Sequence, residues 1–311
     1  MADTVHQPVL TAEVLQLLDP RPGGIYVDGT VGLGGHTQAL IEAGPGIRVI
    51  GIDRDKKALK LAAERLIPFA DQVRLIHGNY RDIGVLLSQL KIVQIDGLLI
   101  DLGVSSLQLE TPPRGFSFRK QGPLDMRMDP SQGITAGYLV NNSTQEKLTT
   151  ILNSYGEERF ARRIARSIVA ERAKGPIETT GELAQIVRGA IPRRFQQKRI
   201  DPATRTFQAL RIAVNHELED LQTGLPAGFD LLAPGGTMAV ISFHSLEDRI
   251  VKHFFRDRAH PPTPPPEIPL PPDKRPAEAT ILTRRPIRPS PGEVARNPRS
   301  RSAKLRAARK I

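Results

Sequence analysis

The chain has 311 residues, of which 39% are hydrophobic and 25% charged, so it is long enough for one large hydrophobic core and a smaller second body. It contains no cysteine, which excludes a disulfide framework, a thiolate nucleophile and a cysteine-ligated metal site. No apolar run approaches the ~18 residues of a membrane span, and the first residues lack a basic region followed by an apolar one. We therefore expect a cytoplasmic protein without a membrane segment.

The net charge of +11 is concentrated in two segments. Residues 284–311 contain ten Lys or Arg against one acidic residue, Glu293. Residues 188–205 carry six basic residues against Asp201. Such clusters are typical of proteins with a polyanionic partner, most often nucleic acid, although either one could also be an ordinary solvated surface.

The first hundred residues alternate short apolar runs with amphipathic segments. We expect strands at Ile25–Asp28, Arg48–Asp53, Val73–His77 and Ile95–Asp101, separated by helices at Thr37–Ala43, Lys56–Leu66 and Ile83–Leu90. This order predicts an α/β fold with a doubly wound, Rossmann-like parallel sheet that has helices on both faces.

The alternation stops after Asp101. Residues 105–140 are rich in Gly, Pro, Ser and Arg, and residues 145–200 have helical periodicity. A fifth strand is expected at residues 235–243, after an amphipathic helix that includes Phe207 and Leu221. We therefore expect a sheet domain of residues 1–104 and 206–311, interrupted by a mainly helical substrate-recognition domain at residues 105–205.

The last part of the chain has three further features. Nine prolines between residues 261 and 276 predict an extended linker or surface loop, because proline cannot continue a helix or a central strand. Thr280–Leu282 is a short candidate strand, and a basic tail follows it. The sequence leaves open whether this tail touches RNA or packs on the sheet.

A glycine-rich segment, DGTVGLGGHT at residues 28–37, joins the first expected strand to the first expected helix. Glycines permit positive φ and close approach to a ligand, and the following helix offers free N–H groups and the positive end of its dipole. A dinucleotide fingerprint requires a third glycine where Thr37 stands, so dinucleotide binding is disfavoured. An acidic residue, Asp28, followed by three spaced glycines instead resembles the first motif of S-adenosylmethionine-dependent methyltransferases.

Three more side chains are expected beside this turn, because ligands of doubly wound sheets bind outside the carboxyl ends of the strands. Asp53 ends the second strand, where a carboxylate can accept both hydroxyls of a ribose. Tyr80 follows the third strand and could lie against an adenine ring, and Asp101 ends the fourth. Three alternatives stay open: Asp28 could cap its strand, Asp53 could cap the next helix, and Tyr80 could be a core residue.

His244 follows the fifth expected strand and is a candidate general base, because histidine titrates near neutrality. A structural histidine, hydrogen-bonded at the strand end, is the interpretation that the sequence favours. The run Ser245-Leu246-Glu247-Asp248 resembles the start of a helix with Ser245 as its cap.

Asp125 and Asp129 lie on either side of Arg127. Two carboxylates without further spaced ligands make a poor metal site. We interpret them as part of a salt-bridged loop and expect no metal.

Longer motifs make the resemblance to one known family specific. They are DLGVSSLQL at 101–109, RGFSF at 114–118, GPLDMRMD at 122–129, PATRTFQALR at 202–211, ISFHSLEDR at 241–249 and NPRSRSAKLR at 297–306, together with residues 28–37 and the opening His6-x-Pro8-Val9-Leu10. In this order, and nearly from end to end, the chain resembles the MraW-type bacterial methyltransferases, which modify the exocyclic N4 amine of a cytosine in small-subunit ribosomal RNA.

The resemblance implies a set of cofactor-binding residues and a partner. S-adenosylmethionine would be bound by Gly34, Gly35 and His36, with Asp53, Tyr80, Asp101 and Gln108 completing the pocket. The partner would be 16S ribosomal RNA near the decoding centre, within an assembled or nearly assembled small subunit.

Four residues are expected to bind the RNA substrate. Arg114, Phe116 and Phe118 combine a cation with aromatic faces, a pairing that can hold an unstacked base. The alternative for Phe116 and Phe118 is packing between the insert and the sheet. Arg205 belongs both to the basic segment 188–205 and to one of the family motifs.

Methyl transfer from a sulfonium depends mainly on positioning of the reactants. Asp101 is the candidate for orienting either the amino acid end of the cofactor or the acceptor amine. The segment Asp101-Leu102-Gly103-Val104 lacks the (Asp/Asn/Ser)-Pro-Pro-(Tyr/Phe) motif that is common in amino methyltransferases. No catalytic base is therefore assigned, and Asp101 and His244 stay candidates.

Two other functional classes remain compatible with the sequence. One is a methyltransferase for a small-molecule or protein acceptor, whose binding would be insensitive to salt. The other is a noncatalytic ribosome-assembly factor that uses the cofactor only as a ligand.

Overall fold

The structure is a computed structural model that describes residues 8–196, 201–261 and 276–311. His6, Lys198, Arg199 and nearly all of the expected proline-rich segment lie outside these residues. The chain forms two compact units, Met1–Gly103 with Glu219–Ile311, and Val104–Leu218. Among the described residues, none of the helices combines the length and the apolar character needed to cross a membrane.

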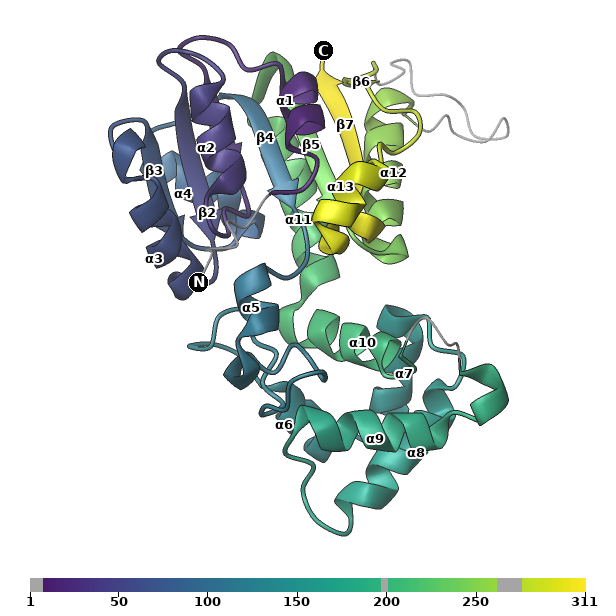
Figure 1. The fold of residues 1–311 in the computed structure, drawn as a ribbon. Helices are drawn as coiled ribbons and strands as arrows, with labels where there is room; N and C mark the ends of the chain where they lie inside the picture. Colours follow the sequence, from purple (N-terminus) through teal and green to yellow (C-terminus); the bar gives the residue numbers. More distant parts are fainter. Residues whose placement is uncertain (1–7, 197–200, 262–275) are drawn as a thin grey trace, which may run out of the picture. The chain divides into compact units, whose positions relative to one another are not determined.

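The first unit contains a seven-stranded sheet in the order β3-β2-β1-β4-β5-β7-β6 (Figure 1). Neighbouring strands from β3 to β5 are parallel, whereas β7 is antiparallel to both β5 and β6. The strands are β1 (Ile25–Asp28), β2 (Arg48–Asp53), β3 (Val73–His77), β4 (Ile95–Asp101), β5 (Leu232–Ser242), β6 (Ala279–Ile281) and β7 (Lys304–Lys310). The first four strands occupy the residues expected from the sequence, so the doubly wound parallel sheet is confirmed.

Helices cover both faces of this sheet. They are α1 (Thr11–Leu18), α2 (Gly35–Glu42), α3 (Lys56–Arg65), α4 (Ile83–Gln89), α11 (Glu217–Asp230), α12 (Ser245–Ala259) and α13 (Pro291–Arg296). Side chains of β4 alternate between the two faces, because successive strand residues point to opposite sides. Leu98 and Ile100 pack in one core with residues of α4, α11 and α12, and Leu99 packs in a second core with α1 and α2. Burial on both faces explains why these strands are continuous apolar runs.

The basic end of the chain completes the sheet. β7 lies between β5 and β6, and Leu305, Ala307 and Ala308 are fully buried. Two of its cations are used internally, because Lys304 Nζ and Arg306 Nε donate to the two oxygens of Asp248, at 3.0 and 2.6 Å. The last residues therefore form a structural strand and not an extended tail.

The second unit is mainly helical. It contains α5 (Ser106–Glu110), α6 (Ala136–Asn142), α7 (Gln145–Gly156), α8 (Ala161–Arg172), α9 (Thr180–Ala190) and α10 (Thr204–Asn215). Its core includes Ile164 and Ile168 of α8 and Phe207 and Leu210 of α10. The inserted domain extends beyond the predicted end at residue 205, because the apolar face of α10 packs in this core and the second unit ends at Leu218.

The loop that precedes α6 contains the expected ion pair. Both oxygens of Asp125 accept hydrogen bonds from the guanidinium of Arg127, each at 2.8 Å. Asp129 instead accepts hydrogen bonds from Ser131 and Gln132. Both carboxylates therefore have partners within the loop.

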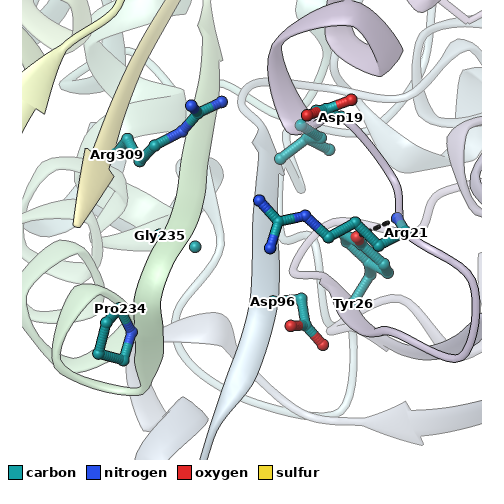
Figure 2. A pocket seen from close by; sticks show the side chains of 9 residues that line it. Asp19, Arg21, Tyr26, Asp96, Pro234, Gly235 and Arg309 are labelled. Atoms are coloured by element: carbon teal, nitrogen blue, oxygen red, sulfur yellow. Dashed lines mark hydrogen bonds between the residues drawn. The ribbon is translucent and has the colours of Figure 1, made fainter. Parts of the chain in front are cut away.

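A small polar pocket lies at the amino ends of the parallel strands (Figure 2). The side chains of Asp19, Arg21, Asp96 and Arg309 line it, and the backbone N–H of Arg21 donates to the hydroxyl of Tyr26 at 2.8 Å. Two acids and two arginines balance in formal charge. The glycine-rich turn lies at the opposite ends of the strands, where doubly wound sheets bind their ligands.

Candidate cofactor site at the carboxyl ends of the strands

The glycine-rich turn links β1 to α2 with backbone geometry that requires glycine. Gly34, the residue before α2, has a φ of 80°, in the left-handed region that glycine adopts without strain. A Cβ at this position would lie 3.1 Å from Leu66 Cδ1. Gly35 and His36 form the first turn of α2, whose N–H groups have no partner within the helix and make an anion-binding end.

Asp28, the last residue of β1, holds the turn by hydrogen bonds to both of its ends. Its side chain is completely buried, and it accepts a hydrogen bond from Thr37 Oγ1 at 2.8 Å and from the backbone N–H of Thr30 at 3.2 Å. Burial raises the pKa of Asp28, while His36 and the hydrogen bonds act in the opposite direction. The hydrogen bonds assign Asp28 a structural role at the end of its strand.

Asp53 connects the turn to the end of β2. Its Oδ2 accepts from the backbone N–H of Gly32 and its Oδ1 from that of Asp55, both at 2.8 Å. Burial raises the pKa of Asp53 to about 6, against the effect of these hydrogen bonds. The cap of α3 is Asp55, which accepts from Lys57 N–H at 3.0 Å, so the alternative in which Asp53 caps that helix is wrong.

His36 and Asp101 form the least satisfied polar pair of this edge. Nε2 of His36 lies 3.6 Å from Oδ2 of Asp101, and the backbone N–H of Asp101 donates to Thr30 Oγ1 at 2.6 Å, which ties β4 to the turn. Within the described residues, both ring nitrogens of His36 and Oδ1 of Asp101 are buried without a hydrogen-bond partner. Buried polar atoms are nearly always hydrogen-bonded to protein, to water or to a ligand, which makes this pair a candidate contact for a bound molecule.

Tyr80 begins a short 3-10 helix, η2 (Tyr80–Asp82), directly after β3. Only 7% of it is exposed, and it packs in the core that contains α4 and α11. A Cβ on Gly224 of α11 would lie 2.6 Å from the Tyr80 ring. Tyr80 is therefore a core residue, and its contact with an adenine stays a prediction.

Comparison with known proteins identifies the family. A sequence model of the MraW methylase family matches residues 3–311. Ribosomal RNA small subunit methyltransferase H of Pelobacter propionicus is 53% identical over 313 residues, which cover all of both chains. The protein of the same name from Geobacter sulfurreducens is 53% identical over 98% of this chain and 99% of its own. That from Heliobacterium modesticaldum is 50% identical over 98% of each chain.

The chain belongs to the MraW methylase family. It is an S-adenosylmethionine-dependent methyltransferase with a doubly wound sheet. The carboxyl edge of the sheet brings together the first turn of α2, the carboxylate of Asp53 and the pair His36 and Asp101. Their contacts with the cofactor stay predictions.

The remaining predicted cofactor residue of this MraW methylase, Gln108, lies in the second unit. It belongs to a capping box at the start of α5, in which its N–H donates to Ser105 Oγ at 3.2 Å and its Oε1 accepts from Ser105 N–H at 3.1 Å. The side chain is 4% exposed. Its contact with the cofactor stays a prediction.

The predicted substrate-binding residues are largely engaged within the second unit. Arg114 Nη2 donates to the carbonyls of Arg127 and Met128, at 3.0 and 2.8 Å. Phe116 is only 8% exposed, and Phe118 packs edge-on against Phe207 with ring centroids 4.8 Å apart.

Arg205 is the most exposed of the four substrate candidates. It lies on α10, and its guanidinium donates to the carbonyl of Glu157 at 3.1 Å. A role of Arg205 and the other three in RNA binding stays a prediction.

His244 caps α12. Its Nδ1 accepts from Glu247 N–H at 3.4 Å, and Glu247 Oε2 accepts from the N–H groups of Phe243 and His244, at 2.8 and 3.2 Å. Nε2 lies 3.1 Å from Glu247 Oε1. The expected cap, Ser245, is instead the first residue of the helix, because the capping box needs a glutamate three residues after the cap and Glu247 stands at that distance from His244.

A buried acid that the sequence analysis did not single out organises the loops after β2 and β3. Asp220, 2% exposed, accepts from Arg81 Nη1 at 2.8 Å, from Asn79 Nδ2 at 2.7 Å and from Arg54. Arg54 directly follows Asp53, and Asn79 directly precedes Tyr80. The partners are separated by more than a hundred residues in the chain, so no local pattern indicates this cluster.

Proposed function

We propose that this MraW methylase transfers a methyl group from S-adenosylmethionine to the exocyclic N4 amine of a cytosine in 16S ribosomal RNA, near the decoding centre. The observation that carries the cofactor site is the buried, unsatisfied pair His36 and Asp101 beside the glycine-rich turn. The RNA substrate is supported by relatives that are about 50% identical over nearly the whole chain and are named ribosomal RNA small subunit methyltransferase H. The cytosine N4 position rests on the family resemblance of the motifs.

The cofactor supplies a methyl group on a positively charged sulfur that needs little further activation. The protein must hold the acceptor in line with that methyl, and positioning of this kind can contribute roughly 7 to 11 kcal/mol. The proposed roles are distributed along the edge of the sheet. Asp53 accepts the ribose hydroxyls, and the first turn of α2 and His36 hold the amino acid end.

Asp101 is the residue best placed to act on the acceptor. The exocyclic amine of cytosine is a poor nucleophile because its lone pair is delocalised into the ring. A carboxylate oxygen that accepts a hydrogen bond from N4–H draws electron density back to the nitrogen, and Oδ1 of Asp101 is such an oxygen without a partner among the described residues. His244 caps α12 through Nδ1, but its Nε2 is also buried without a hydrogen-bond partner among the described residues, so His244 stays the second candidate.

RNA binding is attributed mainly to the second unit. It carries exposed arginines on α8 and η4 (Arg193–Phe195), along with Arg205 on α10. Phosphate contacts by such groups make affinity strongly dependent on salt. The proposed substrate form is an assembled or nearly assembled small subunit, and the proposed location of the protein is the cytoplasm.

The experiment is transfer of labelled methyl from S-adenosylmethionine to small ribosomal subunits and to naked 16S RNA, both from cells that lack the enzyme, followed by nucleoside analysis. We expect N4-methylcytidine, with faster transfer to the assembled subunit. Cofactor binding without transfer to either RNA form would favour a noncatalytic assembly role. Transfer to a protein or small molecule in the same extract would favour a different acceptor.

A further inference from the structure

Two arginines and two phenylalanines form a cluster in the second unit, here called the α8–η4 cluster: Arg159, Phe160, Arg194 and Phe195. All but the half-buried Phe160 are exposed. Phe160 precedes α8 and Phe195 ends η4, and their ring centroids lie 5.3 Å apart with an angle of 44° between the planes. The guanidinium of Arg159 lies 4.8 Å from the Phe160 centroid and 4.5 Å from the Phe195 centroid. That of Arg194 lies 4.8 Å from the Phe195 centroid.

The α8–η4 cluster differs from the other arginine–phenylalanine pairs of this unit in its exposure. Phe195 is 38% exposed, whereas Phe116, which lies under Arg114, is 8% exposed. Phe118 has its ring against Phe207. The sequence predicted a cation beside an accessible aromatic ring at Arg114. In the structure, this combination is found at Arg159 and Phe195 instead.

Positive charge surrounds the α8–η4 cluster in the chain. Arg162, Arg163 and Arg166 are exposed on the first turns of α8, and Arg193 is exposed on η4. Of the two acids that precede Arg159 in the chain, Glu157 is exposed, whereas Glu158 is buried and accepts a hydrogen bond from the backbone N–H of Phe160 at 2.8 Å. Its carboxylate is thus used to hold the local backbone.

We propose that the α8–η4 cluster is a stacking platform for an unpaired nucleobase of the substrate RNA. Single-stranded RNA is held by bases stacked on aromatic rings and guanidinium planes, while neighbouring cations contact phosphates. The Phe195 ring and the guanidinium planes of Arg159 and Arg194 that lie over it form the stacking surface, and the arginines of α8 supply the phosphate contacts. This inference rests on the proposed function, because it assumes an RNA substrate.

The absence of tryptophan from the chain allows a direct test. Phe195→Trp introduces the sole tryptophan, and Tyr138→Trp places one at a matched control position, which is 55% exposed on α6 of the same unit. Each full-length variant is titrated with a single-stranded oligoribonucleotide and with an abasic oligomer of the same length. We expect the RNA to quench the tryptophan fluorescence of the Phe195→Trp variant, whereas the abasic oligomer leaves it unchanged and Tyr138→Trp responds to neither.

A second pair of variants keeps the test independent of the tryptophan substitution. Phe195→Leu retains an apolar side chain but removes the aromatic face, and Phe195→Tyr retains that face. We expect Phe195→Leu to raise the KM for small ribosomal subunits by about 5- to 100-fold, the range for loss of one stacked base, with kcat unchanged. Phe195→Tyr restores the wild-type KM.

The two proposals fail in different ways. If the wild-type protein methylates no RNA, the proposed function fails, whatever the fluorescence titration shows. If it methylates RNA with the same KM in Phe195→Leu, or if RNA and the abasic oligomer quench the Phe195→Trp variant equally, the stacking platform is wrong and the proposed function stands. Equal quenching would assign the α8–η4 cluster to phosphate binding alone.

Discussion

Nε2 of His36 lies 3.6 Å from Oδ2 of Asp101 at the carboxyl edge of the sheet. The two residues come from α2 and β4, which the turn at Thr30 holds together through the N–H of Asp101. Neither ring nitrogen of His36 has a hydrogen-bond partner in the described part of the chain. Buried polar atoms normally have a hydrogen-bond partner, so this pair is a candidate contact for the bound cofactor.

His36→Ala is expected to weaken binding of S-adenosylmethionine by about 10- to 100-fold, the size of one hydrogen bond to a charged group. The free energy of unfolding should also fall, because His36 is 6% exposed and its removal leaves a cavity, so affinities are compared at a temperature at which both proteins are folded. Calorimetric titration and thermal denaturation measure the two effects. The control is Gln38→Ala on the same helix, where Gln38 bonds to Glu42 and Arg65 instead; an equal loss of cofactor affinity in this control would contradict the assignment.

Cofactor binding is expected to weaken as the pH falls below about 6. Burial raises the pKa of Asp53 to about 6, and the ribose hydroxyls require its ionised form as acceptor. The pKa of Asp53 is higher in the folded protein than in the unfolded chain. Its protonation therefore stabilises the cofactor-free fold below pH ~4, and this contribution to the free energy of unfolding is lost as the pH rises through 6. The dissociation constant should therefore rise by up to about tenfold per pH unit on acidification.

Asp53→Asn is the control for this pH dependence. The variant should bind the cofactor weakly at pH 7 and lose most of the variation between pH 5 and 7, since its amide does not titrate there. Calorimetry in buffers of different ionisation enthalpy reports the proton released on binding to the wild type. A pH profile that is unchanged in Asp53→Asn would assign the titration to another group, such as the buried Asp28.

His244 is expected to act as a helix cap and not as a general base. Asn is a good cap, so His244→Asn should keep kcat within a few-fold of wild type, whereas His244→Ala should lower the free energy of unfolding by about 1 kcal/mol. Loss of a general base costs roughly 100-fold or more in rate. Single-turnover methyl transfer and chemical denaturation separate the roles, and a fall of that size in a stable His244→Asn protein would restore His244 as the base.

Asp248→Asn is expected to destabilise the first unit by about 2 to 4 kcal/mol, because loss of one partner leaves a buried cation without its counter-charge. Arg306, whose side chain is 9% exposed, and Lys304 both pair with Asp248. Asp257→Asn on the same helix removes a pair whose side chains are about half exposed, and should cost under about 1 kcal/mol. Equal effects in urea denaturation would show that β7 does not depend on this acid.

The sequence was sufficient for the parallel part of the sheet. β1 to β4 are buried on both faces, so each is an apolar run that ends at a polar residue such as Asp28, Asp53 or Asp101, and the run itself marks the strand. The same polar ends predicted that Asp53 and Asp101 lie at one edge of the sheet, whereas their contact with the cofactor stays a prediction. His36 and Asp101 could therefore be brought together by topology alone.

The rest depended on contacts between distant residues. The sequence of β7 is KLRAARK, and its four cations are typical of a solvated tail. The strand is buried because Asp248, which is distant in sequence, accepts hydrogen bonds from two of these cations. The periodicity of α10 shows that the helix has a buried face but not which core that face joins, so the domain boundary was placed too early. The predicted cap of α12, Ser245, is one residue after the observed cap, His244.

The most direct test of the proposed function is to locate the added methyl group. Small subunits from cells lacking the enzyme are methylated with labelled S-adenosylmethionine, the 16S RNA is cut with nucleases, and the fragments are sequenced by mass spectrometry. The account predicts a single labelled cytosine near the decoding centre, with the methyl on N4. Label on a ring carbon, on a ribose, or at a site remote from the decoding centre would contradict it.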